Sequence, residues 1–290
     1  MNIPTKKLKN WFEISTLGFG TWLMWGRMEH DPENDDKRDI DAIRYAIDSG
    51  MKSIDMAEIY GGGHAEKLVA KAIEWYDRES LYISTKVWGT NHSYEAVKAA
   101  CQGSLERLGI DQIDLYYLHY KEDDINLEET MKAMNELVDE WKIKYIAVSN
   151  FSKESLIKAQ SYSKHPIVAN QVHYNLIYRE CESSWLLKYC QENDVMLVAW
   201  RPVQYGEFQN EENKVILERL AEKYDKTPFQ IALNWLTSQD HVTTLFKSCN
   251  PKNIDENLWA VSFEMSEEDR EDLRKNFPGQ ESVSNTMPLK

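Results

Sequence analysis

Four side chains that can hold or transfer a proton stand close to the ends of short apolar segments. Asp55, Lys86 and His119 each end such a segment, and Tyr60 follows Asp55 by five residues, directly before three glycines. A free tyrosine has a pKa of about 10, and a neighbouring ammonium lowers this value because it stabilises the phenolate. We therefore predict proton-transfer chemistry in which Lys86 activates the phenol of Tyr60 and Asp55 holds Lys86.

Other apolar segments also end in polar or aromatic residues. These ends are Ser149-Asn150, Gln171 with His173, Trp200-Arg201 and Lys247-Ser248. A single His or Lys in such a place is usually a structural polar residue. In a parallel α/β barrel, however, the C-terminal ends of all the strands meet at the face that carries the active site. The recurrence of polar ends therefore favours one assembled site.

The elements that must position these side chains alternate along the chain. The predicted strands are 17–20, 52–55, 81–86, 113–119, 143–149, 168–172, 195–200 and 243–247. The predicted helices are 37–49, 65–76, 94–108, 127–141, 153–161, 181–192, 212–224, 228–238, 251–261 and 267–276. Strands that alternate with amphipathic helices indicate βαβ units and a parallel sheet. Because eight units follow one another without a linker, we predict a single (β/α)8 TIM barrel domain over residues 1–290.

Local signals mark several element boundaries. Ser152, Ser266 and Thr227 are predicted helix N-caps, while Gly50 and Gly109 stand where a helix C-terminus needs a left-handed residue.

Two segments lie outside the eight units. The segment 8–15 alternates around Asn10 and Trp11, which predicts an N-terminal β-hairpin across the bottom of the barrel. The residues 278–290 have no periodic pattern and are predicted to form a loop-like tail after two extra C-terminal helices.

Composition excludes several classes of protein. Among 290 residues, 42% are hydrophobic and 28% charged, which excludes a disordered chain. Lys and Arg number 34 against 48 Asp and Glu, so the net charge of −14 argues against nucleic acid as a partner. No stretch approaches 18 apolar residues and the N-terminus is polar, so we expect a cytoplasmic protein without a membrane partner. The cysteines lack C-x-x-C spacing, which argues against a zinc or dithiol site, and we expect no metal. We also expect a monomer.

Taken together, the segment ends and their flanking residues resemble the aldo-keto reductase family from Leu17 to about Val261. The stretches that carry the resemblance are LGFGTW at 17–22, IDMAEIYG at 54–61, STKVW at 84–88, DLYYLH at 114–119, IAVSNF at 146–151, NQVHYNL at 170–176 and KSCNP at 247–251. Any one of them alone is a weak signal, whereas the whole set is highly specific.

The resemblance implies a (β/α)8 barrel and NAD(P)H-dependent reduction of an aldehyde or ketone to an alcohol by hydride transfer. It places Tyr60 as the general acid toward the carbonyl oxygen and Lys86 as the group that lowers the pKa of Tyr60. Asp55 would orient Lys86, and His119 would orient the small carbonyl substrate.

The resemblance also implies residues that bind the cofactor and the substrate. Ser149, Asn150 and Gln171 would bind the nicotinamide carboxamide, and Trp200 would stack on the nicotinamide ring. The residues expected at the adenosine end are Lys247, Ser248, Glu256 and Asn257. Trp22, Trp88 and Tyr120 would form aromatic walls of the substrate pocket.

Three departures from the family pattern affect these expectations. Trp200-Arg201-Pro202-Val203 replaces the usual Tyr-Ser-Pro-Leu, which removes a serine contact and makes Arg201 a candidate for the cofactor pyrophosphate. The resemblance places Lys247 close to the adenosine 2′-phosphate, which favours NADPH over NADH. Asn253 stands where relatives often have a second phosphate partner, an arginine, so we expect only moderate selectivity. The loop after His119 and the tail after Asn276 are short, which predicts an open pocket.

Three alternatives to carbonyl reduction are open. A Rossmann dehydrogenase is disfavoured because the pattern started by Gly18 and Gly20 has Leu23 at its third glycine. A metal-dependent barrel hydrolase could use Asp55, His119 and His173, but Lys86 beside the site would oppose a cation. The third is a slow-turnover nicotinamide-binding redox sensor or regulatory module, against which the complete set of four proton-transfer residues argues.

Overall fold

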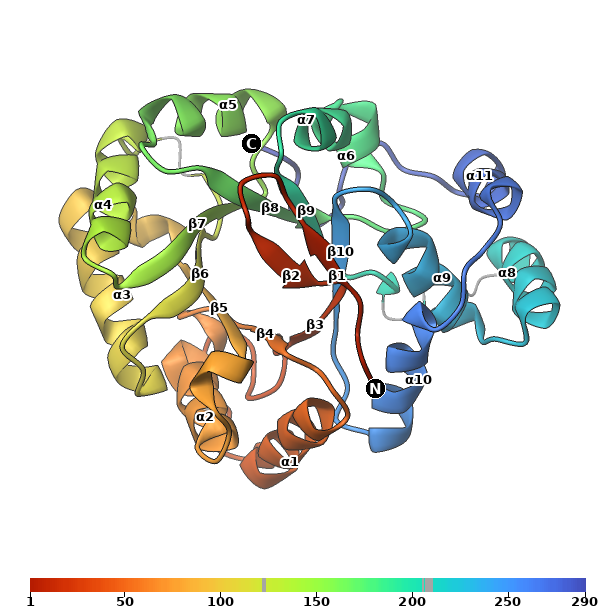
Figure 1. Ribbon diagram of the computed structural model, residues 1–290, viewed down its shortest axis with the longest axis horizontal. Coiled ribbons are helices and arrows are strands. Elements are labelled where there is room, and N and C mark those ends of the chain that lie inside the picture. Colours follow the sequence, from red (N-terminus) through yellow and green to blue (C-terminus); the bar gives the residue numbers. More distant parts are fainter. Residues whose placement is uncertain (122–123, 205, 207–210) are drawn as a thin grey trace.

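Eight parallel strands close into a barrel in the order β10-β3-β4-β5-β6-β7-β8-β9 (Figure 1). The computed structural model describes residues 1–121, 124–204, 206 and 211–290. The barrel strands are β3 (Leu17–Gly20), β4 (Ser53–Asp55), β5 (Tyr82–Val87), β6 (Ile113–Leu118), β7 (Ile143–Ser149), β8 (Ile167–His173), β9 (Met196–Trp200) and β10 (Val242–Phe246). The predicted (β/α)8 barrel is confirmed.

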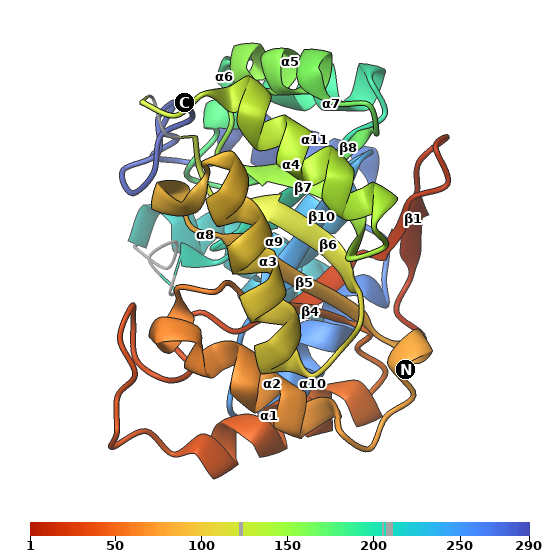
Figure 2. The same ribbon diagram turned by 90° about the vertical axis from the view of Figure 1, so that its left-hand side faces the viewer.

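Helices surround the barrel on all sides (Figures 1 and 2). They are α1 (Asp36–Asp48), α2 (His64–Ile73), α3 (Tyr94–Leu108), α4 (Leu127–Asp139), α5 (Lys153–Tyr162), α6 (Glu180–Ser183), α7 (Leu186–Glu192), α8 (Glu211–Tyr224), α9 (Pro228–Thr237), α10 (Pro251–Leu258) and α11 (Glu267–Asn276). Within the described part of the chain, no helix is long and apolar enough to cross a lipid bilayer.

Burial on both faces explains why the strands read as continuous apolar runs. Every residue of β6 and of β8 is buried, because one side of each strand faces the barrel interior and the other faces the helices. The polar residues that follow these runs therefore emerge together at one end of the barrel.

The predicted helix caps are confirmed. Ser152 accepts a hydrogen bond from the Ser155 backbone N–H, and Thr227 forms a capping box with Gln230 at the start of α9. Gly109 ends α3 with φ 65°, a left-handed conformation that glycine adopts without strain.

The predicted hairpin closes the end of the barrel opposite the polar strand ends, but its first strand lies before the predicted segment 8–15. Strands β1 (Thr5–Lys7) and β2 (Glu13–Ser15) pair antiparallel and lie across the barrel (Figure 1), and Figure 2 shows the C-terminus at the opposite end. Phe12 is fully buried and packs edge-on against Tyr82 and Tyr145, at ring distances of 6.0 and 5.1 Å. The hairpin thus seals this end with apolar contacts.

One predicted helix is wrong in its extent. The segment 181–192 was expected to be continuous, but it breaks into α6 and α7 at Trp185, which adopts φ 64°. The N–H groups of Ser184 and Trp185 close α6 by bonding back to Glu180 and Glu182. No glycine or proline marks this break in the sequence. A tryptophan rarely adopts a left-handed conformation, so the sequence does not predict that the helix ends here.

Candidate active site

Lys86 and Asp55 form a buried ion pair at the C-terminal ends of β5 and β4. Lys86 Nζ donates to Asp55 Oδ1 at 2.5 Å and to the Met56 carbonyl at 2.7 Å, and the lysine has no exposed surface. Burial alone would lower the pKa of Lys86, but the Asp55 carboxylate and Tyr60 outweigh it and raise that pKa above its usual value. The ammonium therefore stays protonated beneath the site.

Tyr60 lies directly above this ion pair. The Lys86 Nζ atom lies 5.2 Å from the centre of the Tyr60 ring and is within hydrogen-bonding reach of its hydroxyl. Tyr60 begins a short turn in which Gly61, Gly62 and Gly63 have φ values of 57°, 60° and 86°. Three successive left-handed residues require glycine, so the glycine run turns the chain from Tyr60 into α2.

His119 completes the group at the end of β6. Its ring meets the Tyr60 ring edge-on with centres 5.8 Å apart. Burial, with a further contribution from the charge of Lys86, holds the pKa of His119 well below its usual value. The imidazole is therefore neutral near pH 7 and offers one N–H donor.

A chain of hydrogen bonds connects these residues to β7, β8 and β9. Gln171 Nε2 donates to Asp55 Oδ2 at 2.9 Å, and Ser149 Oγ donates to the Gln171 carbonyl at 2.8 Å. Asn150 Nδ2 donates both to Ser149 Oγ, at 3.0 Å, and to the His119 carbonyl, at 3.1 Å. The predicted amide and hydroxyl residues are thus fixed relative to the ion pair.

Trp200 is held on one of its faces. Its indole lies parallel to the His173 ring at 4.3 Å and 8°, and its Nε1 donates to Asn150 Oδ1 at 3.1 Å. His173 is itself bonded to Ser284 and Gln204. His173 therefore supports Trp200, while Asp55 is paired with Lys86.

A cavity of about 570 Å³ joins these residues into one site at the C-terminal ends of the strands. The sequence-predicted residues that line it are Asp55, Tyr60, His119, Ser149, Asn150, Gln171, Trp200, Arg201, Lys247, Ser248, Glu256, Asn257, Trp22 and Trp88. Lys86 lies beneath its floor. The cavity runs from the Lys86–Asp55 ion pair to the start of α10.

The far end of the cavity is formed by the start of α10 and the residues before it. Lys247 is exposed, and the Ser248 hydroxyl accepts a hydrogen bond from the Asn250 N–H at 3.0 Å. The Glu256 carboxylate accepts from the Thr227 hydroxyl at 2.6 Å, which ties α10 to α9. A helix N-terminus beside the exposed ammonium of Lys247 suits an anionic group.

The three aromatic residues predicted as pocket walls differ in position. Trp22 packs against Tyr60 with ring centres 4.8 Å apart, and Trp88 meets the ring of His119 at 5.2 Å. Tyr120 does not line the cavity, because it lies behind Trp88 at 4.8 Å and fills the space above Gly89. Its contribution to the wall is to support Trp88.

The C-terminal tail makes the pocket less open than expected. Its end is pinned beside the site, where the Lys290 N–H donates to the Asn150 carbonyl at 3.0 Å and the Ser152 N–H donates to the Lys290 carbonyl at 2.7 Å. Arg201 Nη1 donates to Thr286 Oγ1 at 2.7 Å. The expectation of an open pocket is therefore wrong on this side. The loop after His119 includes residues 122 and 123, which lie outside the described residues.

Several cavity residues carried no signal in the sequence. They include Met28, Gln204, Phe229, Leu233, Thr286 and Met287. Phe229 and Leu233 belong to a helix whose apolar residues resemble core positions, and Thr286 and Met287 belong to the irregular tail. Only the three-dimensional path of these segments brings them to the cavity.

Comparison with known proteins agrees with this arrangement. The Aldo/keto reductase family profile matches residues 16–276. The chain is 33% identical to the glyoxal reductase of Bacillus subtilis, over 93% of this chain and 91% of that protein.

Solved structures agree as well. A thermostable aldo-keto reductase solved with the inhibitor epalrestat is 39% identical, covers 93% of this chain and 98% of its own, and superposes with a TM-score of 0.91. An aldo/keto reductase from Klebsiella pneumoniae, solved with NADP and acetate, is 28% identical with a TM-score of 0.84, over 99% of both chains. With a matching barrel, a matching profile and relatives over nearly the full length, this chain belongs to the aldo-keto reductase family.

Proposed function

We propose that the protein reduces the carbonyl group of a small aldehyde or ketone to an alcohol, with NADPH as the hydride donor. The observation that carries this proposal is the buried Lys86–Asp55 ion pair directly beneath the Tyr60 ring, at the floor of a cavity. Among the described residues, Asp55 is the carboxylate that pairs with Lys86, and the lysine charge also acts on the phenol of Tyr60.

The residues divide the work of proton delivery. Tyr60 donates its phenolic proton to the carbonyl oxygen as negative charge develops on that atom, and the Lys86 ammonium stabilises the resulting phenolate. Neutral His119 donates an N–H to the same oxygen and fixes the direction of approach. Asp55 keeps Lys86 charged and in place through the 2.5 Å hydrogen bond.

The cavity would hold a dinucleotide with its nicotinamide end near Tyr60. When bound, NADPH supplies the hydride that reaches the carbonyl carbon. Trp200 offers a face fixed by His173 and Asn150, against which a planar ring can stack. Ser149, Asn150 and Gln171 line the same cavity and would bind the carboxamide.

Cations are available for the phosphate groups. Lys247 and the start of α10 suit the adenosine end, with Ser248, Glu256 and Asn257 beside them. Arg201 is bonded to Thr286 of the tail, so reaching the pyrophosphate requires this contact to open. Related aldo-keto reductases have been crystallised with NADP and NADPH, which supports the choice of cofactor.

Replacement of Tyr60 by phenylalanine tests the proposal. Tyr60→Phe keeps the ring and removes the acid, so steady-state carbonyl reduction is expected to fall by ~10²–10⁴-fold while NADPH binding, followed by fluorescence quenching, stays unchanged. Retention of most of the turnover would contradict the assignment of the acid.

The same assay separates an enzyme from a redox sensor. A reductase sustains many turnovers after the first oxidation of bound NADPH, whereas a slow-turnover sensor shows the first oxidation without a sustained rate. The sustained rate is the expected result.

A further inference from the structure

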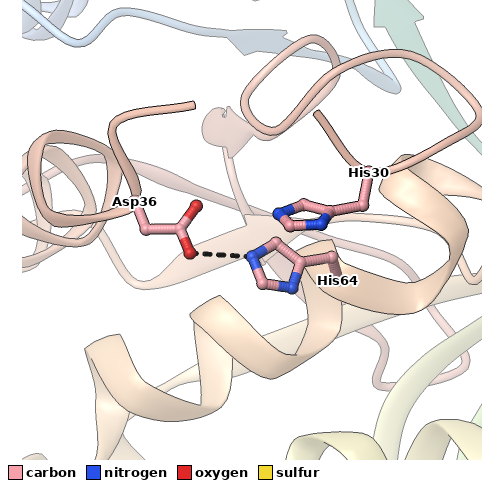
Figure 3. A group of neighbouring side chains, drawn as sticks. All are labelled: His30, Asp36 and His64. Carbon is pink, nitrogen blue, oxygen red and sulfur yellow. Dashed lines mark hydrogen bonds and ion pairs between the residues drawn. The ribbon is translucent and has the colours of Figure 1, made fainter. Parts of the chain in front are cut away.

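A second group of chemically active side chains lies outside the cavity. His30 belongs to the loop after β3, Asp36 is the first residue of α1 and His64 is the first residue of α2. One ligand atom from each of the three lies within 4.8 Å of the other two, and all three side chains are exposed or partly exposed. Figure 3 shows the two imidazoles side by side, with the Asp36 carboxylate facing them.

Two imidazole nitrogens and one carboxylate oxygen are a donor set that Zn²⁺ and its neighbours in the first transition row bind strongly. We propose that His30, Asp36 and His64 form a binding site for a divalent transition-metal ion, with Zn²⁺ as the representative ion. Water would occupy the remaining coordination positions, because the site faces solvent. The proposal is independent of carbonyl reduction.

The geometry needs only a small adjustment to accept an ion. His64 Nε2 and Asp36 Oδ2 are 2.9 Å apart, and the two imidazole centres are 3.9 Å apart with an interplanar angle of 42°. Metal–ligand bonds of about 2.0–2.2 Å in a tetrahedron place ligand atoms roughly 3.4 Å from one another. The imidazole of His30 is exposed and can close the remaining gap by turning about its side-chain bonds.

Supporting contacts already orient the carboxylate. Asn34 Nδ2 donates to Asp36 Oδ1 at 3.0 Å, which leaves Oδ2 directed at the imidazole of His64. Hydrogen bonds of this kind to a ligating group hold it in place and strengthen metal binding. The same Asn34 amide also donates to Asp39 Oδ2 at 3.0 Å, so its own position is fixed.

The charge of the surrounding segment attracts cations. Residues 27–38 contain five acidic side chains against three basic ones, Arg27, Lys37 and Arg38, and the acidic ones are Glu29, Asp31, Glu33, Asp35 and Asp36. This negative charge offsets the positive ends of the two helix dipoles at Asp36 and His64, which alone would repel a cation.

Two other surface histidines provide an internal comparison. His165 lies 2.9 Å from Asp139, and His241 lies 3.9 Å from Asp194. Each has a carboxylate neighbour, but among the residues that the structure describes only the cluster at His30 brings three potential ligands together. His165 therefore has the His–Asp contact without the second imidazole, which makes it a matched control.

An ion at this site would connect two segments that border the active-site cavity. Met28, two residues before His30, lines the cavity, and Tyr60 lies four residues before His64. The two segments already share a hydrogen bond from the Gly61 N–H to the Arg27 carbonyl at 2.9 Å. Metal binding would add a second link and fasten the loop after β3 to the turn that carries Tyr60.

Titration of the full-length protein with Zn²⁺, after removal of metals by a chelator, tests the proposal. Calorimetry should show one ion bound per chain, and His30→Ala should weaken binding by about tenfold or more. The control His165→Ala should bind as tightly as the wild type. Binding should also raise the thermal unfolding temperature of the wild type but not that of His30→Ala.

Cobalt provides a second readout of the ligands. Co²⁺ bound to the wild type should give the visible spectrum of nitrogen and oxygen ligands, without a thiolate charge-transfer band, and His64→Ala should abolish it. The proposal is overturned if no ion binds at one per chain, if His30→Ala binds Zn²⁺ as the wild type does, or if His165→Ala weakens binding equally. Carbonyl reduction without added metal reports that each variant is folded.

Discussion

Lys86 and Arg179 are both buried cations, but they are bonded in different ways. Lys86 has one carboxylate partner and one carbonyl partner, and it faces a tyrosine at the floor of the cavity. Arg179 is 5% exposed, and its three nitrogen atoms donate to the carbonyls of Leu176, Leu273 and Arg274 at 3.1–3.2 Å.

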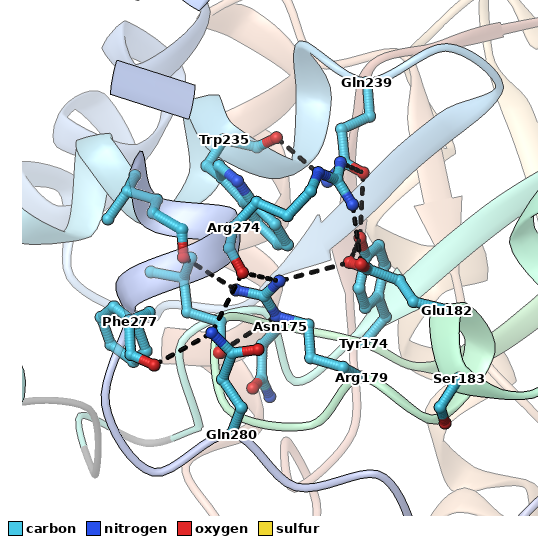
Figure 4. A network of polar contacts seen from close by, with 12 residues as sticks. Tyr174, Asn175, Arg179, Glu182, Ser183, Trp235, Gln239, Arg274, Phe277 and Gln280 are labelled. Atoms are coloured by element: carbon cyan, nitrogen blue, oxygen red, sulfur yellow. Dashed lines mark hydrogen bonds and ion pairs between the residues drawn. The ribbon is translucent and has the colours of Figure 1, made fainter. Parts of the chain in front are cut away.

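The Arg179 cluster joins the end of β8 to the C-terminal helix α11. Arg274 donates to Glu182 at 2.7 Å and to Gln239 at 2.8 Å, and the Tyr174 hydroxyl is within hydrogen-bonding distance of both of these residues (Figure 4). The guanidinium of Arg179 stands 3.5 Å from Glu182. None of these five residues lines the active-site cavity.

The pKa values of the two cations move in opposite directions. Burial outweighs the attraction of Glu182 and lowers the pKa of Arg179, whereas the attraction of Asp55 and Tyr60 outweighs burial and raises the pKa of Lys86. Arg179 donates hydrogen bonds to backbone carbonyls and so joins segments of the chain. Lys86 directs its charge at a group that a ligand can reach. The partners of a buried charge, rather than its burial, indicate its role.

The largest expected effect comes from removing the charge beneath the tyrosine. Lys86→Met keeps much of the side-chain volume, and we expect carbonyl reduction to fall by about 10³-fold because the phenolate loses its stabilising ammonium. The pH profile of the residual rate should move to higher pH. Steady-state kinetics from pH 5 to 10 measure both effects. If Lys86→Met keeps a high rate of carbonyl reduction and an unchanged pH profile, Lys86 is a structural residue only.

The second prediction is that substitution of Arg179 lowers stability rather than turnover. Arg179→Met leaves three carbonyls and Glu182 without one of their partners, so the free energy of unfolding should fall by about 3–5 kcal/mol, as measured by urea denaturation. Turnover by the remaining folded protein should stay close to that of the wild type. Arg179→Lys is the matched control, since it keeps the charge but loses the planar fork and should lie between the two. A loss of turnover in Arg179→Met without a loss of stability would contradict a structural role for Arg179.

The difference between these cations also shows what the sequence alone can predict. Asp55, Lys86 and His119 were found because the C-terminal ends of parallel strands share one face, so position along the chain translates into position in space. Helix caps and the hairpin were found because their signals span only a few residues. Within such local patterns the sequence was sufficient for the barrel and for most of the residues around the cavity.

Features that depend on contacts between distant segments were not predicted. Nothing near Arg179 in the sequence indicates that its guanidinium reaches the carbonyls at 273 and 274. The tail approaches the site because Ser284 bonds to His173 and Lys290 bonds to Asn150. A periodic pattern cannot reveal such contacts, because the residues involved are more than 90 positions apart.

The third prediction concerns a buried group that is kept neutral. Burial lowers the pKa of His173 to about 4, against about 6.5 in an unfolded chain. The unfolded state therefore binds more protons between these values, so stability falls as the pH drops from 6.5 to 4, by up to about 3 kcal/mol. His173→Gln lacks this contribution. Denaturant unfolding at pH 7 and pH 4 should show a smaller loss for the variant, and equal losses would contradict it.

The smallest expected effect comes from Lys247. This cation is exposed, so solvent weakens its attraction to a phosphate, whereas burial strengthens the attraction of Lys86 to its partners. Lys247 lines the cavity at the end proposed for the adenosine 2′-phosphate. A hydrogen bond to a charged group contributes ~1.5–3 kcal/mol, and screening at an exposed site brings this toward a preference of about tenfold for NADPH over NADH. Lys247→Ala should remove most of that preference, measured as the ratio of kcat/KM for the two cofactors.

Asn253→Arg, at a neighbouring position on the cavity wall, should increase the preference for NADPH by adding a bidentate partner for the phosphate. Both ratios should shrink at high salt, and a wild type without preference, or a Lys247→Ala variant that keeps it, would place the phosphate elsewhere.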